Sequence, residues 1–74
     1  RAIRVLGDRW SLLIIRDAFM GVRRFQDFLE RTGTSRATLT NRLQALVRSG
    51  ILKRVQYSEA PARFEYRLTD KGRD

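Results

Sequence analysis

The chain has 74 residues, a formal net charge of +8 and 42% hydrophobic residues, which describe one small folded domain rather than a disordered basic tail. It contains neither cysteine nor histidine, so a disulfide framework and the common zinc and iron sites are excluded within it, and no cofactor is predicted. The charge predicts a polyanionic partner; a nucleic acid, an acidic membrane surface and an acidic protein would each satisfy it.

The N-terminal third is predicted to form two helices. Residues 1–6 read as a short helix ended by Gly7, and Asp8 suits the N-cap of a second helix over residues 9–20. The apolar residues of this second helix fall on two sides: Trp10, Leu13, Ile14 and Ala18 on one, and Leu12, Ile15 and Phe19 on the other. Such a helix is expected to be buried between two layers, one formed by the rest of this domain and the other by the first helix, alone or with a partner subunit. It is too short to span a bilayer, so a cytoplasmic protein without a membrane partner is expected.

A helix-turn-helix is predicted in the middle of the chain. Residues 22–24 read as a short extended segment, and a helix over 25–31 is broken at Thr32 and Gly33. Ser35 is a suitable N-cap for the next helix, over 36–49, which Gly50 ends. The turn over 32–34 joins the two helices of the motif.

The C-terminal part changes to a period of two, which predicts strands over 51–57 and 63–68 joined by a loop over 58–62. The second strand places Phe64, Tyr66 and Leu68 on one face and Arg63, Glu65 and Arg67 on the other. Thr69 then suits the cap of a last helix that begins at Asp70.

This order of elements predicts an α+β, mainly α, winged helix-turn-helix with a C-terminal two-stranded β-hairpin as the wing. Residues 1–74 form a single domain in this interpretation. Because the chain begins with Arg1 and ends inside a starting helix, we expect it to be a fragment of a slightly longer protein.

The charge is concentrated where the motif would read DNA. Residues 31–54 contain six basic side chains and no carboxylate. The helix over 36–49 carries its apolar residues, Leu39, Leu43, Leu46 and Val47, on one side, and small, polar or basic residues on the other. A solvated helix normally mixes both signs of charge, so this one-sided positive helix favours a DNA groove.

The DNA-binding candidates at the start of this helix are Ser35, Arg36, Thr38, Thr40, Asn41 and Arg42. Arginine can pair with guanine and asparagine with adenine, while hydroxyls reach phosphates. The helical wheel points Thr38, Asn41 and Arg42 away from the leucines, and leaves Arg36 and Thr40 at the flanks as backbone contacts. Two alternatives remain open: Ser35 caps the helix with or without DNA, and Arg42 and Arg48 can form a solvated face.

Four further basic residues are candidates outside this helix. Arg63 follows the predicted loop, where a wing arginine can enter the minor groove; a pair with Glu59 or Glu65 is an equally good interpretation. Arg24, Lys53 and Arg54 are candidates for phosphate contacts. Five aromatic residues are interpreted as core packing because they repeat in phase with the apolar pattern: Trp10, Phe25, Phe28, Phe64 and Tyr66.

Catalysis has no support in the sequence. The eight carboxylates are scattered among caps, helix faces and strands, and no histidine is available to activate Ser11 or Ser35. No glycine-rich phosphate loop is present. The chain is therefore predicted not to be an enzyme.

Four stretches resemble the HxlR-type transcriptional regulators, a branch of the MarR-like winged-helix group. They are LGDRWSLLIIRDAFMG at 6–21, RRFQDFL at 23–29, SRATLTNRLQALVRSGIL at 35–52 and PARFEYRLTDKGR at 61–73, and they occur in the order and spacing of that family. Together they cover nearly the whole chain.

The resemblance implies a bacterial, cytoplasmic homodimer that binds a palindromic operator, mostly as a repressor. It also implies that the helix over 36–49 reads the DNA, and that the first helix and a C-terminal helix, begun here at 69–74, form the dimer interface. Several members sense oxidants through a cysteine near the N-terminal helix, and this chain has none. A small-molecule effector is not identified by these residues.

The sequence thus predicts a sequence-specific double-stranded DNA-binding transcriptional regulator. The alternative is a winged-helix module for protein or RNA interaction, since a fold does not fix a function. Competition with random duplex DNA discriminates between them.

Overall fold

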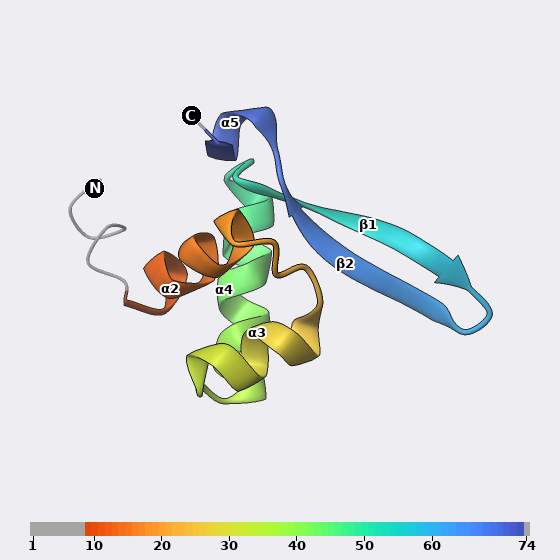
Figure 1. Ribbon diagram of the computed structural model, residues 1–74, viewed down its shortest axis with the longest axis horizontal. Coiled ribbons are helices and arrows are strands. Elements are labelled where there is room, and N and C mark those ends of the chain that lie inside the picture. The colour runs from red at the N-terminus through yellow and green to blue at the C-terminus, as the bar shows by residue number, and fades with distance from the viewer. Residues whose placement is uncertain (1–8, 74) are drawn as a thin grey trace.

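The computed structural model describes residues 9–73, whose elements follow the predicted order (Figure 1). The three long helices are α2 (Arg9–Phe19), α3 (Phe25–Thr32) and α4 (Arg36–Arg48). A hairpin of β1 (Leu52–Glu59) and β2 (Ala62–Leu68) projects from them, and the short α5 (Asp70–Arg73) follows. The predicted winged helix-turn-helix is confirmed. The predicted first helix and the Asp8 cap lie outside the described residues.

One hydrophobic core joins the helices to the base of the hairpin. Its buried members are Ile14, Ala18, Phe28, Leu39, Leu43, Leu46, Leu52 and Leu68. They come from all three long helices and from both strands, so the hairpin base is fixed to the helical body while its tip extends away (Figure 1). Within residues 9–73 no helix is long and apolar enough to cross a membrane.

The helix α2 lies across α4 and buries one side of itself. The buried residues are Ser11, Ile14, Asp17 and Ala18. On its other side Leu12 is 44% exposed and Phe19 56% exposed, and the adjoining Met20 is 63% exposed. No element within residues 9–73 covers this second side; the first helix, which was expected to cover it, lies outside the described residues, so the burial of this side stays a prediction.

A carboxylate is fully buried between α2 and α3, which periodicity alone did not predict. Asp17 is 0% exposed, and its Oδ1 accepts from Arg31 Nε at 3.2 Å and from Arg16 at 3.3 Å. A buried charge needs such partners, because desolvation of an unpaired carboxylate is costly. The Arg31 contact ties α3 to α2.

The turn of the helix-turn-helix comprises Gly33, Thr34 and Ser35, one residue later than predicted. Thr32 remains helical, and its Oγ1 donates to the carbonyl of Phe28 at 2.8 Å. Gly33 ends α3 with a φ of 74°, a left-handed conformation that glycine adopts at little cost, and its N–H donates to Leu29 O at 3.0 Å.

The hairpin is longer and more tightly connected than predicted. The strands pair in antiparallel register, with Leu52 opposite Leu68 and Arg54 opposite Tyr66, and the predicted loop over 58–62 shrinks to a turn at residues 60–61. Cross-strand pairing extends both strands to the turn, and a bulge between Gln56 and Ser58 absorbs the mismatch in length.

The expected alternation along β2 holds only partly. Leu68 is buried and Phe64 and Tyr66 are half-buried, but Glu65, predicted to face solvent, is 6% exposed. Arg67 lies two residues away on the same face, and its Nε donates to Glu65 Oε1 at 2.6 Å. The ion pair makes burial of this carboxylate tolerable, and the prediction of an exposed Glu65 is wrong.

The predicted cap of α5 is confirmed. The N–H of Gly72 donates to Thr69 Oγ1 at 3.0 Å, and Thr69 in turn donates from its own N–H to Ile51 O at 3.0 Å. Lys71 Nζ also donates to Ser49 O at 2.9 Å. A Cβ on Gly72 would lie only 2.2 Å from Ile51 O, so α5 docks on the segment that follows α4 at a distance that glycine alone permits.

Candidate nucleic-acid interface

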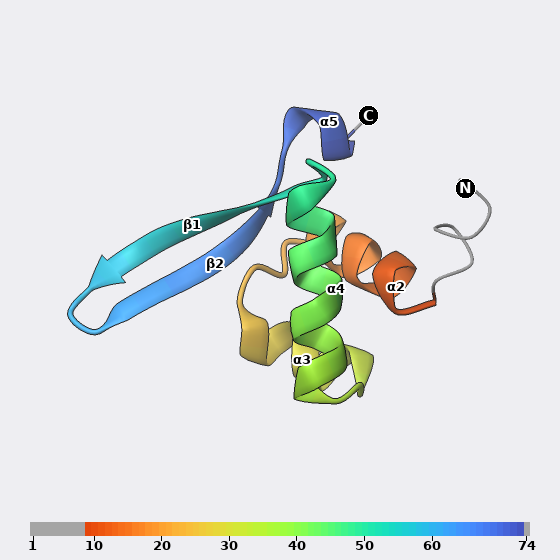
Figure 2. The same ribbon diagram turned by 180° about the vertical axis from the view of Figure 1, so that it is seen from behind.

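The helix α4 separates its side chains into a buried side and an exposed side. Leu39 and Leu43 are fully buried, and Leu46 is 4% exposed. The exposed residues are Arg36, Ala37, Thr40, Asn41, Gln44 and Arg48. Seen from behind, α4 lies in front of the other helices and no described element crosses it (Figure 2). The helix is therefore held by its leucines and leaves its acid-free side accessible.

The N-terminus of α4 is capped as predicted. Ser35 Oγ accepts from the N–H of Thr38 at 3.1 Å, in the geometry of an N-cap. The same Oγ donates to Thr38 Oγ1 at 3.0 Å. This confirms the capping interpretation of Ser35, whose side chain remains exposed next to the positive end of the helix dipole.

The orientation predicted for two residues of α4 is wrong. Thr38 and Arg42 are half-buried, whereas Arg36 and Thr40, expected at the flanks, are exposed with Asn41. Thr38 and Arg42 each precede a buried leucine and stand four residues apart, so they follow the border of the buried stripe. The exposed face is thus rotated toward Arg36 and Thr40.

Three of the candidate arginines lie over aromatic rings. Arg54 Cζ lies 3.8 Å from the centroid of Phe64, Arg24 lies 4.6 Å from that of Tyr57, and Arg36 lies 5.8 Å from that of Phe25. A cation over a ring is attracted by about 0.5–1 kcal/mol at exposed sites. These contacts restrict the guanidinium groups while leaving the three arginines exposed.

A groove of about 490 Å³ lies between α4 and the hairpin. It is lined by Phe25, Thr40, Gln44, Val47, Arg48, Arg54 and Tyr66. Of these seven described residues none is acidic, and the exposed members are polar or basic. The arrangement brings Thr40 and Arg54, two predicted site residues from different elements, to one depression.

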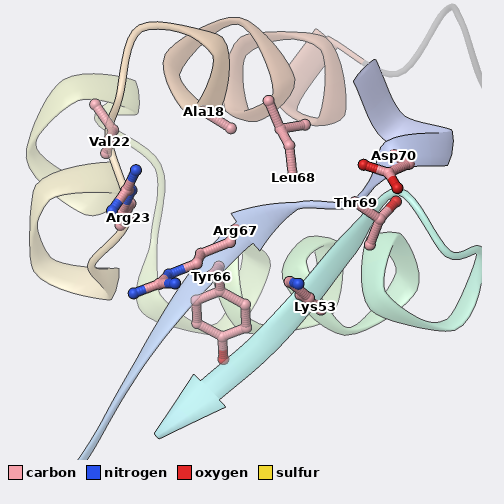
Figure 3. A pocket seen from close by; sticks show the side chains of 9 residues that line it. All are labelled: Ala18, Val22, Arg23, Lys53, Tyr66, Arg67, Leu68, Thr69 and Asp70. Atoms are coloured by element: carbon pink, nitrogen blue, oxygen red, sulfur yellow. The ribbon is translucent and has the colours of Figure 1, made fainter. Parts of the chain in front are cut away.

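Lys53 is separated from that groove. It pairs in register with Arg67, while the adjacent Arg54 pairs with Tyr66, and neighbouring strand residues point to opposite faces. A second hollow of about 400 Å³ lies on this other face, with Lys53, Arg67 and Arg23 around it and Asp70 at its edge (Figure 3). The structure therefore does not bring Lys53 and Arg54 together.

Arg63 is exposed on the hairpin, opposite Ser58. The alternative pairing of Arg63 with Glu59 or Glu65 is wrong for the described residues, because Glu65 pairs with Arg67 and no ion pair involves Arg63. Arg63 is the second residue of β2 and follows the turn at residues 60–61, at the end of the hairpin that projects from the helices.

Two residues that line the groove were not among the predicted site residues: Gln44, and Arg48, for which a solvated face was one open alternative. With Thr40 they stand at successive positions four residues apart on α4. This i, i+4, i+8 spacing is a signal that the sequence contains, since such residues share a helix face. The same spacing does not predict that the hairpin lies beside that face of α4.

The fold and its exposed basic helix define a winged helix-turn-helix of the type that reads duplex DNA. The family model described as HxlR-like helix-turn-helix matches residues 5–74. The chain belongs to this family, which confirms the resemblance inferred from the four sequence stretches.

Similar curated proteins are named as HTH-type transcriptional regulators. One from Mycobacterium tuberculosis is 53% identical over 74 residues, covering 100% of this chain and 47% of its own length. Another from Synechocystis is 42% identical and covers 97% of this chain and 54% of itself. The chain thus spans about half the length of these curated relatives.

Solved structures agree with the fold. The reduced form of the transcriptional regulator YodB from Bacillus subtilis superposes with a TM-score of 0.86 at 36% identity, covering 97% of this chain and 72% of that one. A Pseudomonas aeruginosa protein, solved as a candidate transcription factor, gives a TM-score of 0.87 at 44% identity, covering 100% and 51%.

Proposed function

We propose that the protein is a sequence-specific double-stranded DNA-binding transcriptional regulator that acts in the cytoplasm. The observation that carries this proposal is the accessible side of α4, which holds Arg36, Thr40 and Asn41 and no carboxylate. Arginine and asparagine on a groove-bound helix can distinguish guanine and adenine by paired hydrogen bonds. The family of HTH-type regulators supports the same function.

Within this proposal the contacts divide by position. The exposed Asn41 faces the bases, while the exposed Ser35, Arg36 and Thr40 bind the sugar-phosphate backbone near the helix start. Thr38 and Arg42, half-buried at the border of this face, have a smaller share in the contact. Arg24 and Arg54 bind backbone beside the wing, and Arg63 at the wing enters the adjacent minor groove. Lys53 is left out, because it occupies the face of the hairpin turned away from α4.

We further propose that the protein binds as a homodimer and represses by occupying a palindromic operator. Leu12, Phe19 and Met20 form an exposed apolar side of α2 that a second subunit could cover. Two-fold symmetry would place the two copies of α4 in successive major grooves, about 34–36 Å apart. The operator should then be an inverted repeat with that spacing.

Selection of binding sites from random duplexes tests the central claim. The intact protein should enrich inverted repeats, and its affinity for a selected site should fall steeply between about 50 and 200 mM salt because bound phosphates release counterions. No enrichment, or an affinity that salt does not change, would contradict DNA reading. Displacement of bound DNA by RNA but not by random duplex would favour an RNA-binding module.

Replacement of Asn41 by alanine tests base reading. The loss on the selected site should be about 1–3 kcal/mol, with little loss on random duplex, because a base contact carries sequence information. Thr40→Ala is the matched control on the adjacent exposed position: its loss should be similar on both duplexes. Equal losses for Asn41→Ala on the two duplexes would assign it to the backbone.

A further inference from the structure

The groove between α4 and the hairpin has the composition of an anion site. Its rim is formed by the exposed Thr40, Gln44 and Arg48 from α4 and by Arg54 from β1. Every one of these side chains can donate a hydrogen bond, and two carry a positive charge. Its floor is apolar or aromatic, with Val47 and two rings from α3 and β2.

We propose that this groove binds one phosphate of the DNA backbone, gripped from both sides by Arg48 and Arg54. The inference rests on the proposed DNA-binding function and specifies where the backbone lies. A helix inserted in the major groove has a row of phosphates along each flank, and the flank of α4 beside the hairpin is the line Thr40, Gln44 and Arg48. The backbone on that flank would lie between the helix and the wing.

Phe64 is a positioning residue for this phosphate site. Arg54 and Phe64 are on the same face of the hairpin, since Arg54 pairs with Tyr66 and Gln56 pairs with Phe64. The guanidinium lies 3.8 Å from the ring centroid, which is the shortest of the three arginine–aromatic contacts. Stacking on a ring leaves the guanidinium edge, with its N–H groups, free to meet a phosphate.

The stacked contact also lowers the entropic cost of binding. A free arginine side chain loses substantial rotamer freedom when it is fixed on a phosphate. In this chain part of that freedom is already lost, because Arg54 rests on Phe64 before DNA arrives. Tyr66, the cross-strand partner of Arg54, lines the same groove.

A scan of neutral methylphosphonates along a selected operator tests the proposal. Replacing one charged phosphate per half-site at the α4–wing flank should weaken wild-type binding by more than about tenfold, because both arginines lose a charge-assisted hydrogen bond. In Arg54→Ala or Arg48→Ala the protein should bind unmodified DNA more weakly, and the methylphosphonate should weaken binding clearly less than in the wild type, because one arginine remains. The double variant should show almost no methylphosphonate effect. The salt slope should fall by about 1 per chain in each single variant.

Lys53→Ala is the matched control, because it removes the same charge from the adjacent residue on the opposite face of the hairpin. It should retain the full methylphosphonate effect. Phe64→Leu should reduce the effect and Phe64→Tyr, which restores a ring, should preserve it, with thermal melting of each variant confirming the fold.

The outcomes separate the two proposals. Wild-type protein that selects no duplex sequence defeats the proposed function itself. Selective binding in which every methylphosphonate penalty persists undiminished in Arg54→Ala and Arg48→Ala defeats the phosphate site alone. If the methylphosphonate effect is reduced in both arginine variants but unchanged in Phe64→Leu, the positioning role of the ring is overturned.

Discussion

The helices α2 and α4 differ in which kinds of side chain they bury and which they expose. α4 buries leucines alone and exposes polar and basic residues, whereas α2 buries Asp17 and Ser11 and exposes Leu12 and Phe19. An amphipathic helix needs only one partner surface, and its other side is then available to a ligand. One side of α2 makes a polar contact with α3, and its other side is apolar and exposed. This combination suits a helix that lies between two protein layers.

The comparison predicts that substitutions on the leucine side of α4 lower the stability of the fold most. Leu43→Ala should lower the free energy of unfolding by about 2–5 kcal/mol, because it leaves a cavity at a fully buried site. Urea denaturation measures this. Gln44→Ala, the next residue on the exposed side, should change stability by less than about 0.5 kcal/mol. Comparable losses for the two would show that the sides of α4 are not distinct.

The buried polar contact of α2 should contribute less to the stability of the fold than the leucines of α4. Arg31→Ala should cost about 1–3 kcal/mol: it leaves Asp17 buried with Arg16 as remaining partner, and Arg31 is itself 43% exposed. Arg48→Ala removes an exposed arginine and should cost less than about 0.5 kcal/mol. If both variants melt alike, the ion pair does not hold α3 on α2.

The cap of α4 comes next in size. Ser35→Ala should cost about 1 kcal/mol, because the N–H of Thr38 loses its side-chain acceptor. Ser35→Asp keeps an acceptor and should restore stability, although its charge would oppose DNA. Thermal denaturation and duplex binding measured on the two variants should therefore rank them in opposite order, and a shared order would contradict this division.

The smallest effect on the folding of the chain is expected at the exposed side of α2. Phe19→Ser should change monomer stability by less than about 0.5 kcal/mol, since the side chain is 56% exposed. In a homodimer the same change should raise the dissociation constant measurably by sedimentation equilibrium. Arg9→Ser, an exposed change at the other end of α2, is the control. If Phe19→Ser and Arg9→Ser self-associate equally, the exposed apolar side of α2 is not part of the dimer interface.

The sequence predicted the elements of the fold well because their signals are local. Ser35, Gly33 and Thr69 mark helix ends through hydrogen bonds within a few residues, and the leucine spacing defines the buried side of α4. The strand ends were less predictable, since cross-strand pairing continues both strands into residues with weak strand preference.

Burial of charge could not be predicted from spacing. Asp17 is buried because Arg31, distant in sequence, reaches it from another helix, and Glu65 because Arg67 covers it. The candidate site shows the same limit. The sequence predicted that this site is basic. It did not predict that Arg36 is exposed or that Lys53 and Arg54 lie on opposite faces of the hairpin, because both depend on tertiary contacts.

The docking of α5 gives the molecule a mechanical property. Lys71 and Thr69 donate hydrogen bonds to the carbonyls of Ser49 and Ile51, which follow α4. Gly72 lies so close to Ile51 that no side chain would fit between them. These contacts tie the C-terminal residues 69–72 to residues 49–51, the segment that joins α4 to β1. A change in the position of α5 is therefore expected to act first on the junction between α4 and β1, where α4 ends and β1 begins.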